Sequence, residues 1–364
     1  MTMAAQHKNP LRIGLLGAGM IGREHAALLA KHAGTRLVAL ADPSPEAVAY
    51  AASLGVPHHA NYIEMLDQER LDAVIVALPN ALHVEAGLAC VERGLPMLME
   101  KPIAENVATA MRLVEAAEAA RVPMLVGHHR RHSPDIREAR RAIAAGELGD
   151  ITAISGMWMV KKQDSYFDAA WRRKIGGGPM LINLIHDIDC LRYMCGDIES
   201  VQAIASSKAR GFEVEDTAAV IFRFASGALG SFTMSDVVPS PFTYDVTSGQ
   251  ALYFHHEPEN CYYIGGRKAT LALPSMNLWG HETPAGDWRD RTVRRGLQPQ
   301  FSSAYDNQLN HFVAVARGEA EPVVSGRDAM TTLAVTLAVD RAAREGRSVL
   351  VAEMLTGSAA PSTV

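Results

Sequence analysis

The first third of the chain alternates short apolar runs with helical patterns. Apolar runs of strand length cover residues 11–16, 36–41, 72–77, 96–100 and 124–127, and helical patterns cover 21–30, 44–54 and 106–120. Short apolar runs bounded by turn residues are typical of strands that are buried on both faces. Because such strands alternate with helices at this spacing, the pattern predicts a doubly wound parallel sheet.

After about residue 130 the pattern changes to longer strands. Strands are predicted at 151–159, 201–209, 217–224, 228–234, 243–249 and 269–273, and helices at 137–145, 180–195, 302–316 and 326–344. The turn Ala225-Ser226-Gly227 predicts a hairpin. Residues 274–300 are turn-rich, and we expect loops there. This half is predicted to be a mainly antiparallel open sheet with helices on one side.

Composition excludes several classes of protein. The formal net charge is −5, from 35 basic and 40 acidic residues, so neither a nucleic-acid partner nor a polybasic membrane anchor is expected. No apolar run approaches the roughly 18 residues of a membrane-spanning helix, and no secretory signal is expected before Pro10. Four cysteines suit neither a disulfide scaffold nor a zinc site. We therefore expect a reduced, cytoplasmic protein without a bound metal.

A glycine motif follows the first predicted strand. Gly17-Ala18-Gly19-Met20-Ile21-Gly22 lies between that strand and the first helix, and Asp42 ends the second strand, 20 residues beyond Gly22. This arrangement is the fingerprint of a dinucleotide site, with pyrophosphate at the helix N-terminus and ribose hydroxyls on the acidic residue. The alternative is a glycine-rich turn with an unrelated aspartate. Because Asp42 would repel a 2′-phosphate, we expect NAD rather than NADP.

Two further motifs carry candidate chemistry. Glu100-Lys101-Pro102 follows the strand at 96–100, and Gly176-Gly177-Gly178 precedes Asn183, His186 and Asp189, which share one helix face. Other matching segments are Ala77-Leu78-Pro79-Asn80 with His83, Gly127 with Arg130-Arg131, Trp171-Arg172-Arg173 and Tyr305-Asp306-Asn307-Gln308. In this order the motifs resemble the Gfo/Idh/MocA family of NAD(P)-dependent sugar and polyol oxidoreductases over nearly the whole length.

The resemblance implies a role for each candidate residue. Lys101 would act at the substrate hydroxyl, and His186 would be its acid/base partner. The implied substrate contacts are Asn183, Trp171, Arg172 and Arg130. The implied cofactor contacts are Gly17, Ala18, Gly19, Met20, Ile21, Asp42, Asn80, His83, Glu100 and Lys101.

One position departs from the family pattern. Many members carry an aspartate four residues before the histidine, where this chain has Ile182. The neighbouring Asn183 can bind a hydroxyl but cannot take a proton, so proton transfer would fall on Lys101 and His186. Simpler readings stay open: Lys101 as a solvated charge, His186 as a core histidine, and Trp171 with Arg172 as a packing pair. Asp187 and Asp189 are expected to be structural charges.

The resemblance implies an NAD-dependent dehydrogenase acting on a secondary alcohol of a sugar, cyclic polyol or related ring. The alternatives are a carboxylated substrate (a dihydrodiol acid, uronic-type or quinate-like compound), an NAD-dependent redox glycosidase, and a non-catalytic dinucleotide-sensing regulator. We expect a flexible terminus at 1–10, a Rossmann domain at 11–130, an α+β substrate-binding and oligomerisation domain at 131–354, and a flexible tail at 355–364. Because helices are expected on only one side of the antiparallel sheet, its other face is predicted to pack against another subunit, in a homodimer or homotetramer.

Overall fold

The computed structural model describes residues 9–251, 254–283 and 285–356. The predicted flexible ends therefore fall largely outside the described residues. Contacts divide the chain into two compact units, the first with residues 1–129 and 305–330 and the second with 130–304 and 331–364. The division after residue 129 lies close to the expected boundary. The segment 305–330 belongs to the first unit, and one of its contacts there is the hydrogen bond from the backbone N–H of Val126 to the oxygen of Val324.

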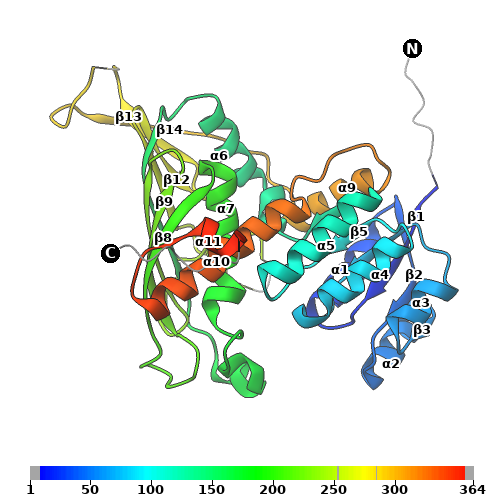
Figure 1. The fold of residues 1–364 in the computed structure, drawn as a ribbon. Helices are drawn as coiled ribbons and strands as arrows, with labels where there is room; N and C mark the ends of the chain where they lie inside the picture. Colours follow the sequence, from blue (N-terminus) through cyan, green and yellow to red (C-terminus); the bar gives the residue numbers. More distant parts are fainter. Residues whose placement is uncertain (1–8, 252–253, 284, 357–364) are drawn as a thin grey trace, which may run out of the picture. The chain divides into compact units, whose positions relative to one another are not determined.

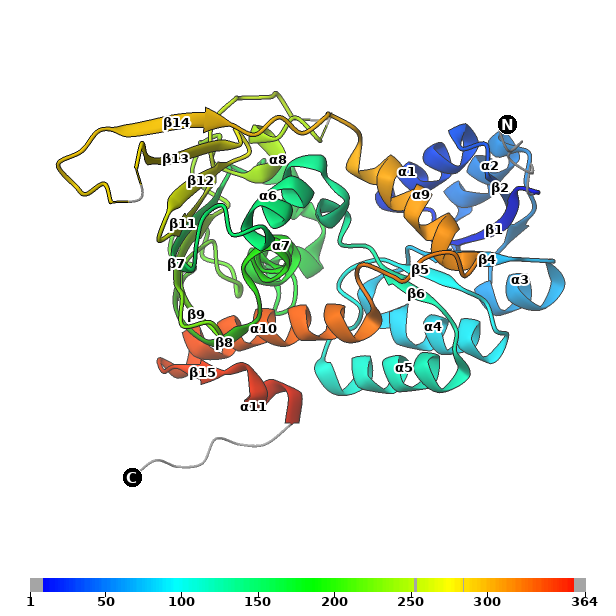
Figure 2. The ribbon, with the colours of Figure 1, turned by 90° about the horizontal axis from the view of Figure 1, so that it is seen from above.

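The first unit is a parallel sheet of six strands in the order β3-β2-β1-β4-β5-β6. The strands are β1 (Leu11–Leu16), β2 (Thr35–Ala41), β3 (His58–His59), β4 (Ala73–Val76), β5 (Met97–Met99) and β6 (Met124–Val126). The helices are α1 (Met20–Lys31), α2 (Pro45–Leu54), α3 (Tyr62–Gln68), α4 (His83–Glu92), α5 (Val107–Ala120) and α9 (Ala304–Ala316). Figure 2 shows α1, α2 and α9 on one side of this sheet and α4 and α5 on the other. The predicted doubly wound sheet is confirmed.

The second unit is built on a nine-stranded sheet in the order β14-β13-β12-β11-β7-β10-β9-β8-β15. The strands are β7 (Ile151–Met159), β8 (Ile198–Ser206), β9 (Thr217–Phe224), β10 (Leu229–Ser235), β11 (Tyr262–Gly266), β12 (Ala269–Leu273), β13 (Asn277–His281), β14 (Thr292–Gly296) and β15 (Val349–Leu350). Its helices are α6 (Pro134–Ala144), α7 (Ile185–Cys195), α8 (Tyr244–Thr247), α11 (Val351–Thr356) and most of α10 (Gly326–Glu345), whose first turn belongs to the first unit. The sheet is antiparallel except where β7 pairs with β10.

The nine-stranded sheet has one covered and one open face. Figures 1 and 2 show α6 and α7 against one face. In β9, the side chains of Val220, Phe222 and Phe224 are buried, while Ile221 between them is exposed. This alternation is the expected signature of a sheet packed on one side. The predicted hairpin is also confirmed, since β9 and β10 pair antiparallel around Gly227.

Two secondary-structure predictions in the second unit are wrong. Residues 243–249 were expected to form a strand, but they contain the short helix α8, in which buried Tyr244 donates a hydrogen bond to Asp135. This tertiary bond fixes a conformation that local propensity does not favour. Residues 274–300 were expected to be loops, but they form β13 and β14. β14 is the edge strand and is largely exposed, and β13, which lies between β14 and β12, buries only Leu278, so neither strand shows an alternation of apolar residues.

Within the described residues, no helix is both long and apolar enough to span a bilayer.

Candidate active site

The three motif glycines at the start of α1 serve different purposes. Gly17 has a φ of +97°, and a Cβ atom there would lie 2.3 Å from the carbonyl oxygen of Ala77. A Cβ at Gly22 would lie 2.1 Å from the oxygen of Gly17. At Gly19, by contrast, a Cβ would meet no described atom within 4 Å. The first and third glycines are therefore required by the fold, whereas the second leaves open space beside the helix N-terminus.

The N-terminus of α1 fits the pyrophosphate of a dinucleotide. Gly19 is its N-cap, and among the described residues no side chain caps the helix and no acidic residue lies in its first turn. Its N–H groups and the positive end of its dipole are thus available to an anion. Met20 is 80% exposed at this position, and Ala18 is buried in the loop beside it.

Asp42 holds the glycine loop to the end of β2. Its carboxylate accepts hydrogen bonds from the N–H of Ala18 at 2.8 Å and from the N–H and hydroxyl of Ser44 at 2.8 and 2.5 Å. Partial burial would raise the pKa of Asp42, but these hydrogen bonds outweigh it and lower the pKa below its ordinary value. The loop therefore has an ionised carboxylate fixed beside it at neutral pH.

Glu100 is a buried anion directly before Lys101. Its Oε1 is hydrogen-bonded to Nε2 of His25 at 2.8 Å, and its Oε2 accepts a hydrogen bond from the backbone N–H of Lys101 at 3.2 Å. Burial would raise the pKa of Glu100, but the bond and charge of His25, with Lys101 and His129, lower it to about 2. A Cβ at Gly127 would lie 3.0 Å from Oε1, which explains the glycine there.

The sequence did not reveal His25, because it lies on an ordinary amphipathic helix three residues beyond Gly22. Only the tertiary fold brings His25 on α1 within hydrogen-bond distance of Glu100, which follows β5 and lies 75 residues away in the sequence. The resulting His25–Glu100 pair connects the glycine-loop helix to the half-buried Lys101.

His83 is tied between two turns. Its Nδ1 lies 2.8 Å from the oxygen of Pro102 and its Nε2 lies 2.8 Å from the oxygen of Leu78, and the residue is fully buried. Burial lowers the pKa of His83, although both hydrogen bonds oppose this. The geometry favours a role for His83 in holding the segment after Lys101 over direct contact with a cofactor. Asn80 lies in the short helical turn Asn80–Leu82 and is partly exposed.

In the second unit, the three glycines Gly176, Gly177 and Gly178 precede the turn that carries Asn183 and His186. A Cβ at Gly178 would lie 2.5 Å from Oε1 of Glu215, and one at Gly177 would lie 2.2 Å from the oxygen of Trp171. The same Oε1 accepts the N–H of Met180 at 2.7 Å, at the start of a π-helical turn (Met180–Leu184) that leads into α7. Asn183 and His186 follow on this turn and on α7, both half-buried.

A lysine that the sequence did not single out bonds Asn183. Nζ of Lys162 donates to Oδ1 of Asn183 at 2.7 Å. Near it, Arg172 donates to the oxygen of Tyr166 at 2.6 Å and lies 4.0 Å above the Tyr166 ring. Trp171 is 53% exposed. Asn183, Lys162 and Arg172 thus belong to one polar region of the second unit.

Arg130, which the sequence suggested as a substrate contact, is buried in ion pairs. Only 2% of it is exposed, and its guanidinium lies 3.0 Å from Asp187 and 2.9 Å from Asp245. Burial alone would lower the pKa of Arg130, but these two carboxylates raise it. Arg131 forms a similar buried pair with Asp189 at 2.6 Å. These contacts favour a structural role for Arg130, and they agree with the interpretation of Asp187 and Asp189 as structural charges.

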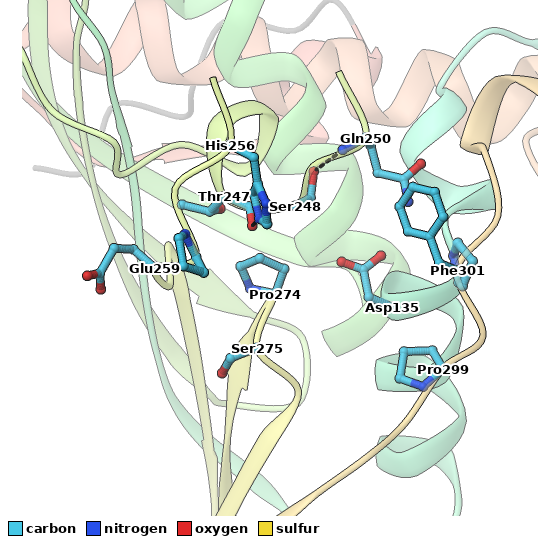
Figure 3. A pocket seen from close by; sticks show the side chains of 12 residues that line it. Asp135, Thr247, Ser248, Gln250, His256, Glu259, Pro274, Ser275, Pro299 and Phe301 are labelled. Carbon is cyan, nitrogen blue, oxygen red and sulfur yellow. Dashed lines mark hydrogen bonds between the residues drawn. The ribbon is translucent and has the colours of Figure 1, made fainter. Parts of the chain in front are cut away.

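A cavity of about 270 Å³ lies elsewhere in the second unit. Asp135 and Gln250 line it together with Phe301, as Figure 3 shows. Burial raises the pKa of Asp135, although hydrogen bonds from Ser133 and Tyr244 oppose this. None of the residues predicted for catalysis, substrate or cofactor lines this cavity.

Comparison with known proteins decides the family. Residues 11–128 match the family model described as "Oxidoreductase family, NAD-binding Rossmann fold", and residues 136–271 match the "GFO/IDH/MocA C-terminal domain". The chain belongs to the Gfo/Idh/MocA oxidoreductase family. The resemblance inferred from the motifs is thereby confirmed, and the parallel sheet of the first unit is an NAD-binding Rossmann fold.

Three relatives in this family match most of the chain. It is 28% identical to an inositol 2-dehydrogenase of Rhizobium meliloti, covering 94% of this chain and 99% of the relative. It is 29% identical to a 1,5-anhydro-D-fructose reductase of Ensifer adhaerens, covering 95% and 99%. The WlbA dehydrogenase of Bordetella pertussis, solved with NADH and UDP-GlcNAcA, has 26% identity and a TM-score of 0.76, covering 94% and 99%.

Proposed function

We propose that this family member is an NAD-dependent dehydrogenase that transfers hydride between the nicotinamide and a secondary alcohol of a sugar, cyclic polyol or related hydroxylated ring. The observation that carries the proposal is Lys101, held beside the buried Glu100–His25 pair in a Rossmann unit whose glycine loop fits a dinucleotide. Relatives named as inositol dehydrogenases support the substrate class.

In this proposal Lys101 and His186 handle the proton. The Lys101 ammonium stabilises the alkoxide that develops as the alcohol loses its proton, and His186 accepts that proton. In the reverse reaction His186 returns it. Asn183, Trp171 and Arg172 orient the substrate. When bound, NAD supplies the hydride acceptor, and Gly17 to Ile21, Asp42 and Asn80 would hold it. Glu100 and His83 act on the position of Lys101.

The proposed preference for NAD rests on Asp42. Its ionised carboxylate lies at the glycine loop, where it would bind ribose hydroxyls and repel a 2′-phosphate. Replacing Asp42 by Asn is expected to weaken NAD binding and to narrow the difference in affinity between NAD and NADP. Titration of both dinucleotides by protein fluorescence measures this.

The test of the dehydrogenase assignment is Lys101→Met. A panel of sugars, polyols and hydroxy acids is incubated with NAD, and NADH formation is followed by absorbance. Turnover should collapse in the variant while NAD affinity is retained. Near-normal turnover would overturn the role of Lys101. Substrate consumption without net NADH would instead favour the redox glycosidase, and dinucleotide binding without any turnover would favour the regulator.

A carboxylated substrate is the second candidate. Arg172 pairs with no carboxylate in the part of the chain that the structure describes, and the WlbA relative was solved with UDP-GlcNAcA. Turnover of acids much faster than neutral sugars would favour this candidate.

We also propose a cytoplasmic homodimer or homotetramer. The open face of the nine-stranded sheet exposes the apolar side chains of Ile204, Ile221 and Leu229, and apolar side chains gathered on one sheet face are often covered by a second subunit. Light scattering that shows a monomer at micromolar concentration would contradict the proposal. All four cysteines are free thiols, as suits a reducing compartment.

A further inference from the structure

Lys162 is a largely buried lysine to which the proposed function gives no role. It follows β7, and its backbone N–H donates to the oxygen of Asp236 at 2.9 Å. Its side chain is only 11% exposed. Nζ lies 4.6 Å from the centre of the Tyr166 ring and 5.4 Å from that of Trp158. Since aromatic faces attract cations, these rings hold the ammonium inside the second unit rather than in solvent.

This ammonium determines the orientation of the Asn183 amide. Nζ donates to Oδ1 of Asn183 at 2.7 Å. An ammonium has three donors and no acceptor, so it can bind the oxygen of an amide but not its nitrogen. The Nδ2 group of Asn183 is therefore directed away from Lys162. It donates to no group within residues 9–251, 254–283 and 285–356.

The nearest carboxylate, Asp236, does not draw the Lys162 ammonium away from Asn183, because Asp236 is hydrogen-bonded to Arg210. Asp236 accepts the Nε of Arg210 at 3.0 Å through Oδ1, while its Oδ2 lies 3.7 Å from Nζ of Lys162. Burial lowers the pKa of Lys162 to about 8, with Arg210 and Arg172 adding to the effect and Asp236 and Glu215 opposing it. Lys162 is thus mostly protonated at pH 7. Once neutral, it has a lone pair that can accept from Nδ2 and let the amide turn over.

We propose that Lys162 is a positioning residue that locks Asn183 with its amide N–H groups toward the substrate, so that this region binds an acceptor oxygen, and a carboxylate more tightly than a hydroxyl. Arg172 adds further donors beside the same Tyr166 ring. Carboxylate oxygens only accept, and their hydrogen bonds to N–H groups are charge-assisted. The inference rests on the proposed function, because it requires Asn183 to contact substrate.

The experiment measures binding without turnover. Calorimetry with enzyme saturated with NADH determines the affinity for uronic acids and for the hexoses that carry a hydroxymethyl group at the same carbon. The variants are Lys162→Met, Lys162→Arg and, as the matched control, Lys161→Met at the exposed neighbouring lysine. Thermal melting verifies that each variant is folded.

Wild-type enzyme should bind the acid about tenfold or more tightly than the hexose, and Lys162→Met should abolish that ratio. Lys162→Arg should retain most of it, because arginine also has donors and no acceptor. In wild-type enzyme the affinity for the acid should fall above pH about 8, whereas Lys162→Arg should show no such fall. A purely structural lysine would change melting but neither the ratio nor the pH profile.

The outcomes separate this inference from the dehydrogenase assignment. If Lys162→Met keeps the acid-to-hexose ratio, or if wild-type enzyme has no such preference, the inference is overturned even where NADH is formed normally. If the ratio depends on Lys162 but no alcohol yields NADH, the inference stands and the proposed reaction fails.

Discussion

Replacing Glu100 by Gln removes one buried charge while keeping the shape of the side chain. Glu100 is 6% exposed, and its pKa is about 2 against an ordinary value of 4.5. At about 1.4 kcal/mol for each pKa unit, the folded state favours the ionised form by about 3 kcal/mol. Because Gln resembles the protonated form, Glu100→Gln should lower the free energy of unfolding by about that amount at pH 7.

The pH dependence follows from the sign of the shift. The pKa of Glu100 is lower in the folded chain, so its contribution is complete above pH 4.5 and is lost as pH falls from there toward 2. Urea unfolding, followed between pH 7 and pH 3, should show the difference between wild type and variant shrinking with acid. Glu105→Gln, at an exposed position five residues away, is the matched control and should change little. A cost below about 1 kcal/mol at pH 7, or one that does not shrink in acid, would refute the reasoning.

Three further predictions concern packing and the glycine loops. Gly19→Ala should leave thermal melting unchanged but weaken NAD binding, whereas Gly17→Ala should lower the melting temperature, because only the latter Cβ meets backbone atoms; calorimetry and NAD titration distinguish them. Arg130→Met should destabilise the second unit by about 3–5 kcal/mol in urea unfolding, since it leaves the buried Asp187 without its cationic partner; exposed Arg137→Met is the control. Gly178→Ala should lower both stability and turnover, because its Cβ would lie 2.5 Å from Glu215. Gly296→Ala is the control and should leave stability and turnover unchanged, because a Cβ there meets no described atom within 4 Å.

Much of the fold could be predicted from local patterns. The apolar runs of β1, β4 and β6 and the strand β9 with the turn that follows it each depend on a few consecutive residues, and the structure confirms them. The errors fall where long-range contacts outweigh local preference. Tyr244 adopts a helical turn because its hydroxyl reaches Asp135, 109 residues away in the sequence. The strands β13 and β14 could not be predicted because β14 is an exposed edge strand and β13 beside it buries a single side chain, so neither needs an apolar pattern.

The candidate site likewise contains residues that the sequence could identify and residues that only the structure shows. The glycine motif and Asp42 could be recognised because the backbone geometry of one turn dictates residue type at fixed spacing. The sequence by itself therefore determined the cofactor fold, the family and the position of Lys101. Only the tertiary structure shows the hydrogen bond between His25 and Glu100. The same holds for the buried ion pair of Arg130 with Asp187 and for the hydrogen bond from Lys162 to Asn183. Such contacts join residues far apart in the chain, and whether a charge is buried and paired or open to a ligand depends on neighbours that no local pattern specifies.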